Sequence, residues 1–147
     1  MKKIVFVVLI ICIGLFWGCN AMREEREVYD KTLRLHIPAD SNDEADQAVK
    51  LKVRDAVIEL LEKPLSKCET KEDSVRIIQN MSEEISQTAN NVLISNDFEY
   101  KATVSLTEEY YPRRSYDGFT LPAGIYTSLK IELGEAEGEN WWCVLFP

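Results

Sequence analysis

His36 is the single histidine of the chain, and histidine is the usual acid–base residue near neutral pH. A histidine that catalyses hydrolysis needs a nucleophile and a carboxylate that orients its ring. Asp40 and Ser41 follow shortly in the sequence and could supply these groups. Proximity in sequence alone does not bring side chains together, however. We therefore expect His36 to be a solvent-facing residue of a strand.

Sites for metal ions, phosphate groups or cofactors are not indicated by the sequence. Acidic residues crowd positions 40–46, where the dipole of a predicted helix stabilises them without a metal. The segment lacks the loop glycine and distal glutamate of an EF-hand. Zinc ligands in a Cys-x-x-Cys or histidine cluster are absent, and Gly134-x-x-x-Gly138 lacks the Lys-Ser/Thr of a phosphate loop. We expect no metal, no cofactor and no enzymatic activity.

Two segments instead have the composition of a protein interface. Residues 110–116 contain two arginines and three tyrosines, and residues 141 and 142 are adjacent tryptophans. Arg, Tyr and Trp are enriched in interface cores. Because neighbouring strand residues point to opposite faces, either both faces of this last strand are covered or one indole is exposed. The residues predicted to bind a partner are Arg113, Arg114, Tyr116, Trp141, Trp142, Lys50 and Arg54.

Residues 1–19 are predicted to be a signal peptide or an N-terminal membrane anchor. A basic start precedes an apolar run over residues 4–17, which is shorter than the ~20 residues of a full membrane span. Cleavage, retention as an anchor and lipidation of Cys19 are the three possible fates. We favour cleavage or retention, because Trp17 makes a poor lipidation motif. Residues 20–30 are polar and predict a linker or a short helix.

The remaining composition limits the class of partner. The chain has 25 acidic and 17 basic residues and a net charge of −8. Such a chain is not suited to nucleic acid or to an anionic membrane surface. Outside the leader, Cys68 and Cys143 could form a disulfide in an oxidising compartment, or remain buried thiols.

Hydrophobic periodicity predicts one α+β domain over residues 31–147. Two amphipathic helices are expected, one beginning at the Ser41–Glu44 capping pattern and ending at Pro64, and one running from Thr70 to residues 90–95. We expect both helices on one face of a roughly four-stranded mixed or antiparallel sheet, with the last strand, which is apolar on both sides, in a central position. The expected strands cover residues 32–37, 98–111, 125–133 and 140–146.

Several segments resemble the stage II sporulation protein R family. Leu121–Tyr126 and Asn140–Pro147 are similar to its C-terminal pattern, which reads F-P-A-G-x-Y, a strand, and then N-W-W-C-V-x-F-P. Leu33–Ile37 and Asp46–Val57 resemble its first strand and its D-Q-x-x-K-x-K-V-R-D helix. Tyr111–Tyr116 is similar to a middle motif. The matched segments span nearly all of residues 31–147.

The resemblance implies an intercellular signal. In this family the protein is made in the forespore and exported into the space between forespore and mother cell. There it activates a membrane-embedded aspartic protease that processes pro-sigma-E. The N-terminal segment would engage the membrane or the export machinery.

Two other functions remain open from the residues alone. One is a cell-envelope hydrolase that uses His36 with Asp40 or Ser41. The other is a structural envelope lipoprotein anchored through Cys19.

Overall fold

The computed structural model describes the backbone of residues 2–116 and 118–146, and their side chains except those of residues 2–10, 19–22, 24 and 25. The fold is α+β, as the sequence predicts. Its elements are α1 (Lys2–Lys31), β1 (Leu33–Pro38), α2 (Glu44–Leu65), α3 (Lys71–Asn80), α4 (Ser82–Ser95), β2 (Ala102–Tyr111), β3 (Arg114–Tyr116), β4 (Phe119–Leu121), β5 (Gly124–Leu133) and β6 (Asn140–Phe146).

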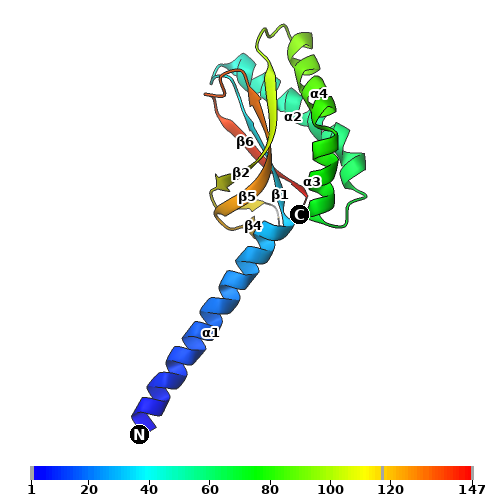
Figure 1. Cartoon of the computed structure of the whole chain (residues 1–147). Helices are drawn as coiled ribbons and strands as arrows, with labels where there is room; N and C mark the ends of the chain where they lie inside the picture. Colours follow the sequence, from blue (N-terminus) through cyan, green and yellow to red (C-terminus); the bar gives the residue numbers. More distant parts are fainter. Residues whose placement is uncertain (1, 117, 147) are drawn as a thin grey trace.

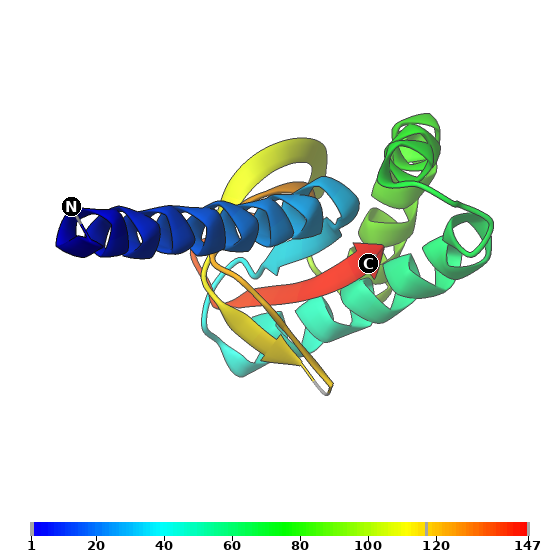
Figure 2. The same ribbon diagram turned by 90° about the horizontal axis from the view of Figure 1, so that it is seen from below.

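The main sheet is mixed and has the strand order β2-β5-β1-β6. β1 runs parallel to β5 and antiparallel to β6, and β2 is antiparallel to β5. Helices α2, α3 and α4 cover one side of this sheet (Figures 1 and 2). Alternate residues of the strands, such as Leu35 and Leu129, join Val53 and Ile85 of the helices in a single core. The short strands β3 and β4 form a separate hairpin.

The two interior positions of the sheet belong to β5 and β1 and not to the last strand, so that prediction was wrong. All six residues of β1 are buried, Arg34 and His36 included. β6 lies at the edge of the sheet, and its residues after Asn140 are half-buried. Because Arg34 and His36 are polar, the sequence predicted that their side of β1 faces solvent. In the structure, side chains and backbone from other strands cover that side.

The helices follow the predicted patterns with two differences. Thr70 caps α3 by accepting a hydrogen bond from the Asp73 amide at 3.1 Å, as predicted. Ser41 does not cap α2, because the helix begins after Asp43 and the Ser41 hydroxyl donates to the Asp46 carboxylate. The predicted second helix is interrupted at Met81, whose backbone (φ −97°, ψ 7°) separates α3 from α4.

α1 continues through the predicted leader and linker and ends against the domain. The Tyr29 hydroxyl donates to the Ala123 carbonyl at 3.0 Å, and Lys71 Nζ donates to the Tyr29 carbonyl at 3.2 Å. The rest of α1 projects away from the domain (Figure 1). Within the part of the chain whose side chains are described, no helix has both the length and the apolar character of a membrane span. The side chain of Cys19, the candidate for lipidation, lies outside the described residues.

The turn between β5 and β6 is bonded to the loop that follows β1. The Gly138 amide donates to the Ala39 carbonyl at 2.9 Å, and the Glu135 amide donates to Asp40 Oδ1 at 2.7 Å. A Cβ atom on Gly138 would lie 2.2 Å from the backbone oxygen of Ser41. This position therefore requires glycine for close backbone approach, and the contact fixes where β6 begins.

We expect Gly138→Ala to lower the free energy of unfolding by about 2–3 kcal/mol, because the added methyl group overpacks a backbone contact. Urea denaturation followed by circular dichroism measures the change. Glu137→Ala in the same turn is the matched control, since this side chain is exposed. Equal stability of the two variants would contradict the observed packing.

Candidate functional site

Arg34 lies at the centre of the sheet face opposite the helices and is fully buried. Its guanidinium carbon is 4.2 Å from the ring centroid of Tyr111 and 5.1 Å from that of Tyr126. Arg34 Nη2 donates to the Tyr116 hydroxyl at 2.7 Å, and Nε donates to the Cys143 carbonyl at 3.1 Å. The negative faces of the tyrosine rings stabilise the positive charge of the guanidinium. Arg34 thereby connects β1 to β2, β5, β6 and the β3–β4 hairpin.

His36 lies on the same face and is also buried, which corrects the prediction of a solvent-facing residue. Its Nδ1 is 2.7 Å from Glu109 Oε2, and its Nε2 is 2.7 Å from Asn140 Oδ1. The Glu109 carboxylate can only accept, so Nδ1 donates to it. Asn140 Oδ1 is also an acceptor, so Nε2 donates to it, and neither ring nitrogen is free to take a proton from a substrate.

The other members of the predicted hydrolytic group lie elsewhere. Asp40 Oδ1 accepts from the Glu135 amide, and the Ser41 hydroxyl donates to Asp46. Both residues therefore have structural roles in the loops beside β6. Neither of these hydrogen bonds involves His36, whereas a catalytic nucleophile must contact the histidine that activates it. The described part of the chain also contains no group of three or more His, Cys, Asp or Glu side chains that could hold a metal ion.

The predicted partner-binding residues gather on both sides of β6. The Arg54 guanidinium carbon lies 4.2 Å from the Trp141 ring centroid, on the helix side of the sheet. Arg114 lies 5.1 Å from the centroid of Trp142 on the opposite side. Both indoles are half-buried. Both faces of the last strand are therefore partly covered, and each indole keeps part of its surface exposed, so the structure lies between the two alternatives for the tryptophan pair.

Two of the predicted contact residues have internal partners. Lys50 is only 4% exposed, and its Nζ donates to Gln47 Oε1 at 2.6 Å and to the Glu139 carbonyl at 2.8 Å. Burial lowers the pKa of this ammonium group below its ordinary value. Lys50 therefore anchors the turn before β6 and is not placed for direct contact. Tyr116 binds Arg34 and stacks on Phe119 with ring centroids 5.2 Å apart.

The β3–β4 hairpin adds one residue that the sequence reading missed. Phe119 is 48% exposed in β4, where it pairs with Tyr116 of β3, and Arg113 and Arg114 are exposed as well. We call Arg113, Arg114, Phe119 and Trp142 the hairpin surface. The Asp-Gly pair at 117–118 is the sequence signal for this turn, and Gly118 has the positive φ of 94° that such turns favour.

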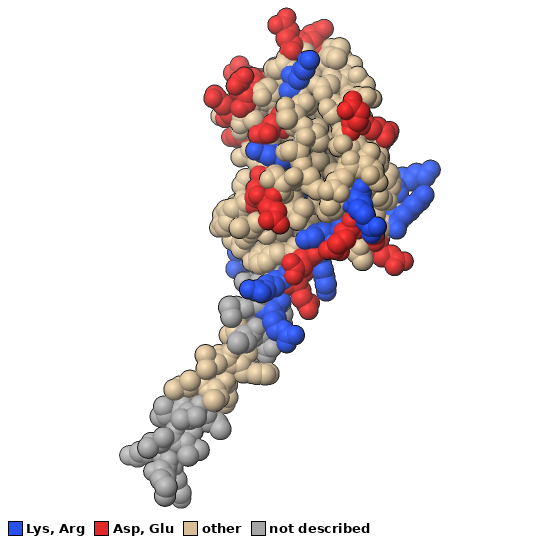
Figure 3. Space-filling model, viewed as in Figure 1, with Lys and Arg blue, Asp and Glu red and all other residues tan. Residues whose placement is uncertain are grey.

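Charge is unevenly distributed around the domain. Figure 3 shows acidic side chains gathered at the end of the domain far from α1, while basic side chains gather toward the end from which α1 leaves, among some acids. The exposed arginines of the hairpin surface are therefore a local basic feature of an acidic protein, which has a net charge of −8. A basic feature of this kind favours a partner surface that carries carboxylates.

Cys68 and Cys143 are free thiols in the structure. Cys143 lies in β6 opposite Leu35, and the Cys68 thiol after α2 donates to the Pro64 carbonyl. Burial raises the pKa of the Cys143 thiol above its ordinary value. Cys143 therefore stays protonated at neutral pH.

The fold and the site define a class: a small α+β protein with a basic and aromatic surface. Residues 29–147 match the sequence model of the family described as Stage II sporulation protein R. The chain is 30% identical to the Stage II sporulation protein R of Bacillus subtilis (strain 168), with all of this chain and 70% of that protein covered. The chain therefore belongs to the Stage II sporulation protein R family, a family of sporulation proteins. No solved structure matches it.

We expect His36→Ala to lower the free energy of unfolding by about 2–4 kcal/mol, because the change leaves the half-buried Glu109 carboxylate without its donor. Thr103→Ala, at an exposed position of β2, is the control and should change stability little. Chemical denaturation measures both variants. A native-like midpoint for His36→Ala would show that the histidine has no structural role.

Alkylation of Cys143 by iodoacetamide at pH 7 should be much slower in the native protein than in urea, because the raised thiol pKa leaves little thiolate. The native rate should increase at higher pH than that of an ordinary thiol. Peptide mass spectrometry reads each cysteine separately. Rapid native alkylation, or a peptide that links Cys68 to Cys143, would contradict the buried free thiol.

Proposed function

We propose that the chain is an exported sporulation signal that activates a membrane-embedded aspartic protease, the enzyme that processes pro-sigma-E. In this proposal the forespore makes the chain and exports it into the space facing the mother cell. Membership of the family supports the sporulation role. The resemblance of the sequence motifs to that family implies that the partner is the protease. The observation that carries the contact mechanism is the exposed Arg114 side chain over Trp142.

Activation by contact requires that the chain bind the active state of the protease more tightly than the inactive state. The hairpin surface has suitable chemistry, because Arg113 and Arg114 can pair with carboxylates while Phe119 and Trp142 provide apolar area. Trp142 is already fixed against His36 and Tyr111, with ring centroids 5.5 and 5.2 Å apart. A fixed side chain loses less conformational entropy on binding than a mobile one.

The position of α1 supports a role near the membrane. Its last turn is fixed to Ala123 and Lys71, and the helix continues without interruption toward the predicted leader. If the leader is retained as an anchor, the domain and the membrane-embedded protease share one membrane. Attachment to the same surface raises the effective concentration of each protein for the other.

The test is reconstitution in a non-sporulating bacterial host that expresses the protease, pro-sigma-E and this chain. We expect cleavage of pro-sigma-E when the chain is exported, and no cleavage when residues 1–19 are deleted and the chain remains in the cytoplasm. Immunoblotting separates precursor from product. Cleavage without the chain, or absence of cleavage with the exported chain, would contradict the proposed function.

In the same host, replacing Arg113 and Arg114 together by Ala should reduce cleavage by roughly tenfold or more, as for other interface hot spots. Secretion and thermal stability should be unchanged, because both side chains are exposed. Lys67→Ala with Lys101→Ala is the matched control, since it removes two exposed charges elsewhere. Full cleavage with the double arginine variant would remove the hairpin surface from the proposal.

A further inference from the structure

The outer edge of β6 has no strand partner in the described part of the chain, because β6 ends the sheet and pairs with β1 alone. Such an edge presents unpaired backbone N–H and C=O groups. Val144 lines two grooves, one of about 450 Å³ against α2 and one of about 350 Å³ against the end of α1 and the β3–β4 hairpin. The edge is therefore open from both faces of the sheet near Val144.

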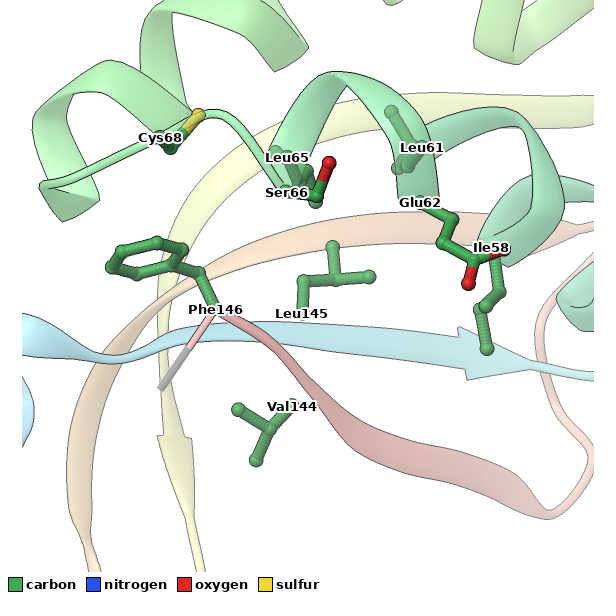
Figure 4. Close-up of a pocket in the computed structure, with 9 residues that line it drawn as sticks. All are labelled: Ile58, Leu61, Glu62, Leu65, Ser66, Cys68, Val144, Leu145 and Phe146. Carbon is green, nitrogen blue, oxygen red and sulfur yellow. The ribbon is translucent and has the colours of Figure 1, made fainter.

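The groove between α2 and β6 is predominantly apolar. Ile58, Leu61 and Leu65 line it from the helix, and Val144, Leu145 and Phe146 line it from the strand. Figure 4 shows Leu145 and Phe146 pointing toward α2, while Ile58 and Glu62 extend from the helix toward β6. Ile58 is 38% exposed, which is unusual for an isoleucine beside a core. A strand edge beside a helix is the architecture in which an extended peptide adds to a sheet and places alternate side chains in a groove.

The charge of the groove limits what can occupy it. Glu62 is the charged residue of its lining, and Glu59 is exposed on the same helix, whereas Asp55 is paired with Arg54 at 2.6 Å. An occupant with a Lys or Arg side chain would be attracted to this flank. A second copy of this chain would bring the same acids face to face, and each copy has a net charge of −8. Charge complementarity thus favours a different, basic partner over self-association.

We propose that the α2–β6 groove is a peptide-docking site. It takes an extended, apolar segment of a partner protein that carries a basic side chain, and the segment adds to β6 as a fifth strand. Backbone hydrogen bonds to the outer edge of β6 align the peptide with the strand. Ile58 and Leu145 contact its apolar side chains, and Glu62 pairs with its basic side chain. The proposal is independent of the proposed function, because it concerns a different surface and a binding event that can be measured without the protease.

The test uses the full-length chain in lipid nanodiscs and a capped seven-residue peptide, Val-Thr-Val-Lys-Val-Thr-Val, which matches β6 in length. Amide hydrogen exchange of residues 141–146 is measured with and without the peptide. We expect the peptide to slow exchange at the outer amides of β6 by at least about tenfold, because strand addition protects them. A peptide with N-methylated backbone amides cannot form the ladder and should give no protection.

Two variants test the groove itself. Ile58→Lys should abolish the protection, whereas Ile94→Lys, which changes an isoleucine that is 69% exposed on α4, should not. Glu62→Lys should weaken protection by the lysine peptide and strengthen protection by the same peptide with Glu in place of Lys. Glu62 is exposed, so this exchange of charges does not depend on a change in folding.

Three results would overturn the proposal. One is the absence of protection by the lysine peptide. The second is protection that survives Ile58→Lys or N-methylation of the peptide. The third is protection of β6 in the absence of peptide together with a dimer in analytical ultracentrifugation, which would assign the edge to a second copy of the chain.

Discussion

A buried positive charge without a carboxylate partner sets the organisation of this protein. None of the ion pairs in the described part of the chain includes Arg34, although its side chain is fully buried. A charge in such a position costs several kcal/mol unless polar and aromatic groups surround it. Tyr111, Tyr126, Tyr116 and the Cys143 carbonyl supply these groups. Each comes from a different strand, so surrounding Arg34 in this way requires the sheet and the hairpin to be assembled together. Within the described residues, Arg34 Nη1 is buried without a hydrogen-bond partner.

The same requirement positions the surfaces that are available to a partner. The bond from Arg34 to Tyr116 holds the β3–β4 hairpin against the sheet, and the hairpin carries Arg114 onto Trp142. The bond from Arg34 to the Cys143 carbonyl holds β6, which pairs with β1 and ends the sheet. One buried residue thus supports two different exposed surfaces, the hairpin surface and the α2–β6 groove.

Local patterns in the sequence were sufficient for the fold class and for most of the elements. Residues 102–106 and 129–133 alternate because every second side chain of these segments meets the core. The burial of β1 could not be predicted in this way, because it depends on partners 73–109 positions away. The break at Met81 was missed because the apolar periodicity continues through it. Composition led to the prediction that Trp141, Trp142 and the arginines bind a partner. Only the tertiary structure shows which arginine covers which indole, and that the side chain of Lys50 is buried.

The central claim is that the chain acts by contact through residues arranged around β6, and not through a catalytic group of its own. Site-specific photo-crosslinking in the reconstituted host tests this contact directly. A photoreactive amino acid at position 114 should crosslink to the protease, while the same amino acid at position 101, an exposed site just before β2, should not. Processing of pro-sigma-E that proceeds without any crosslink from position 114, or with equal crosslinking from both positions, would contradict the account.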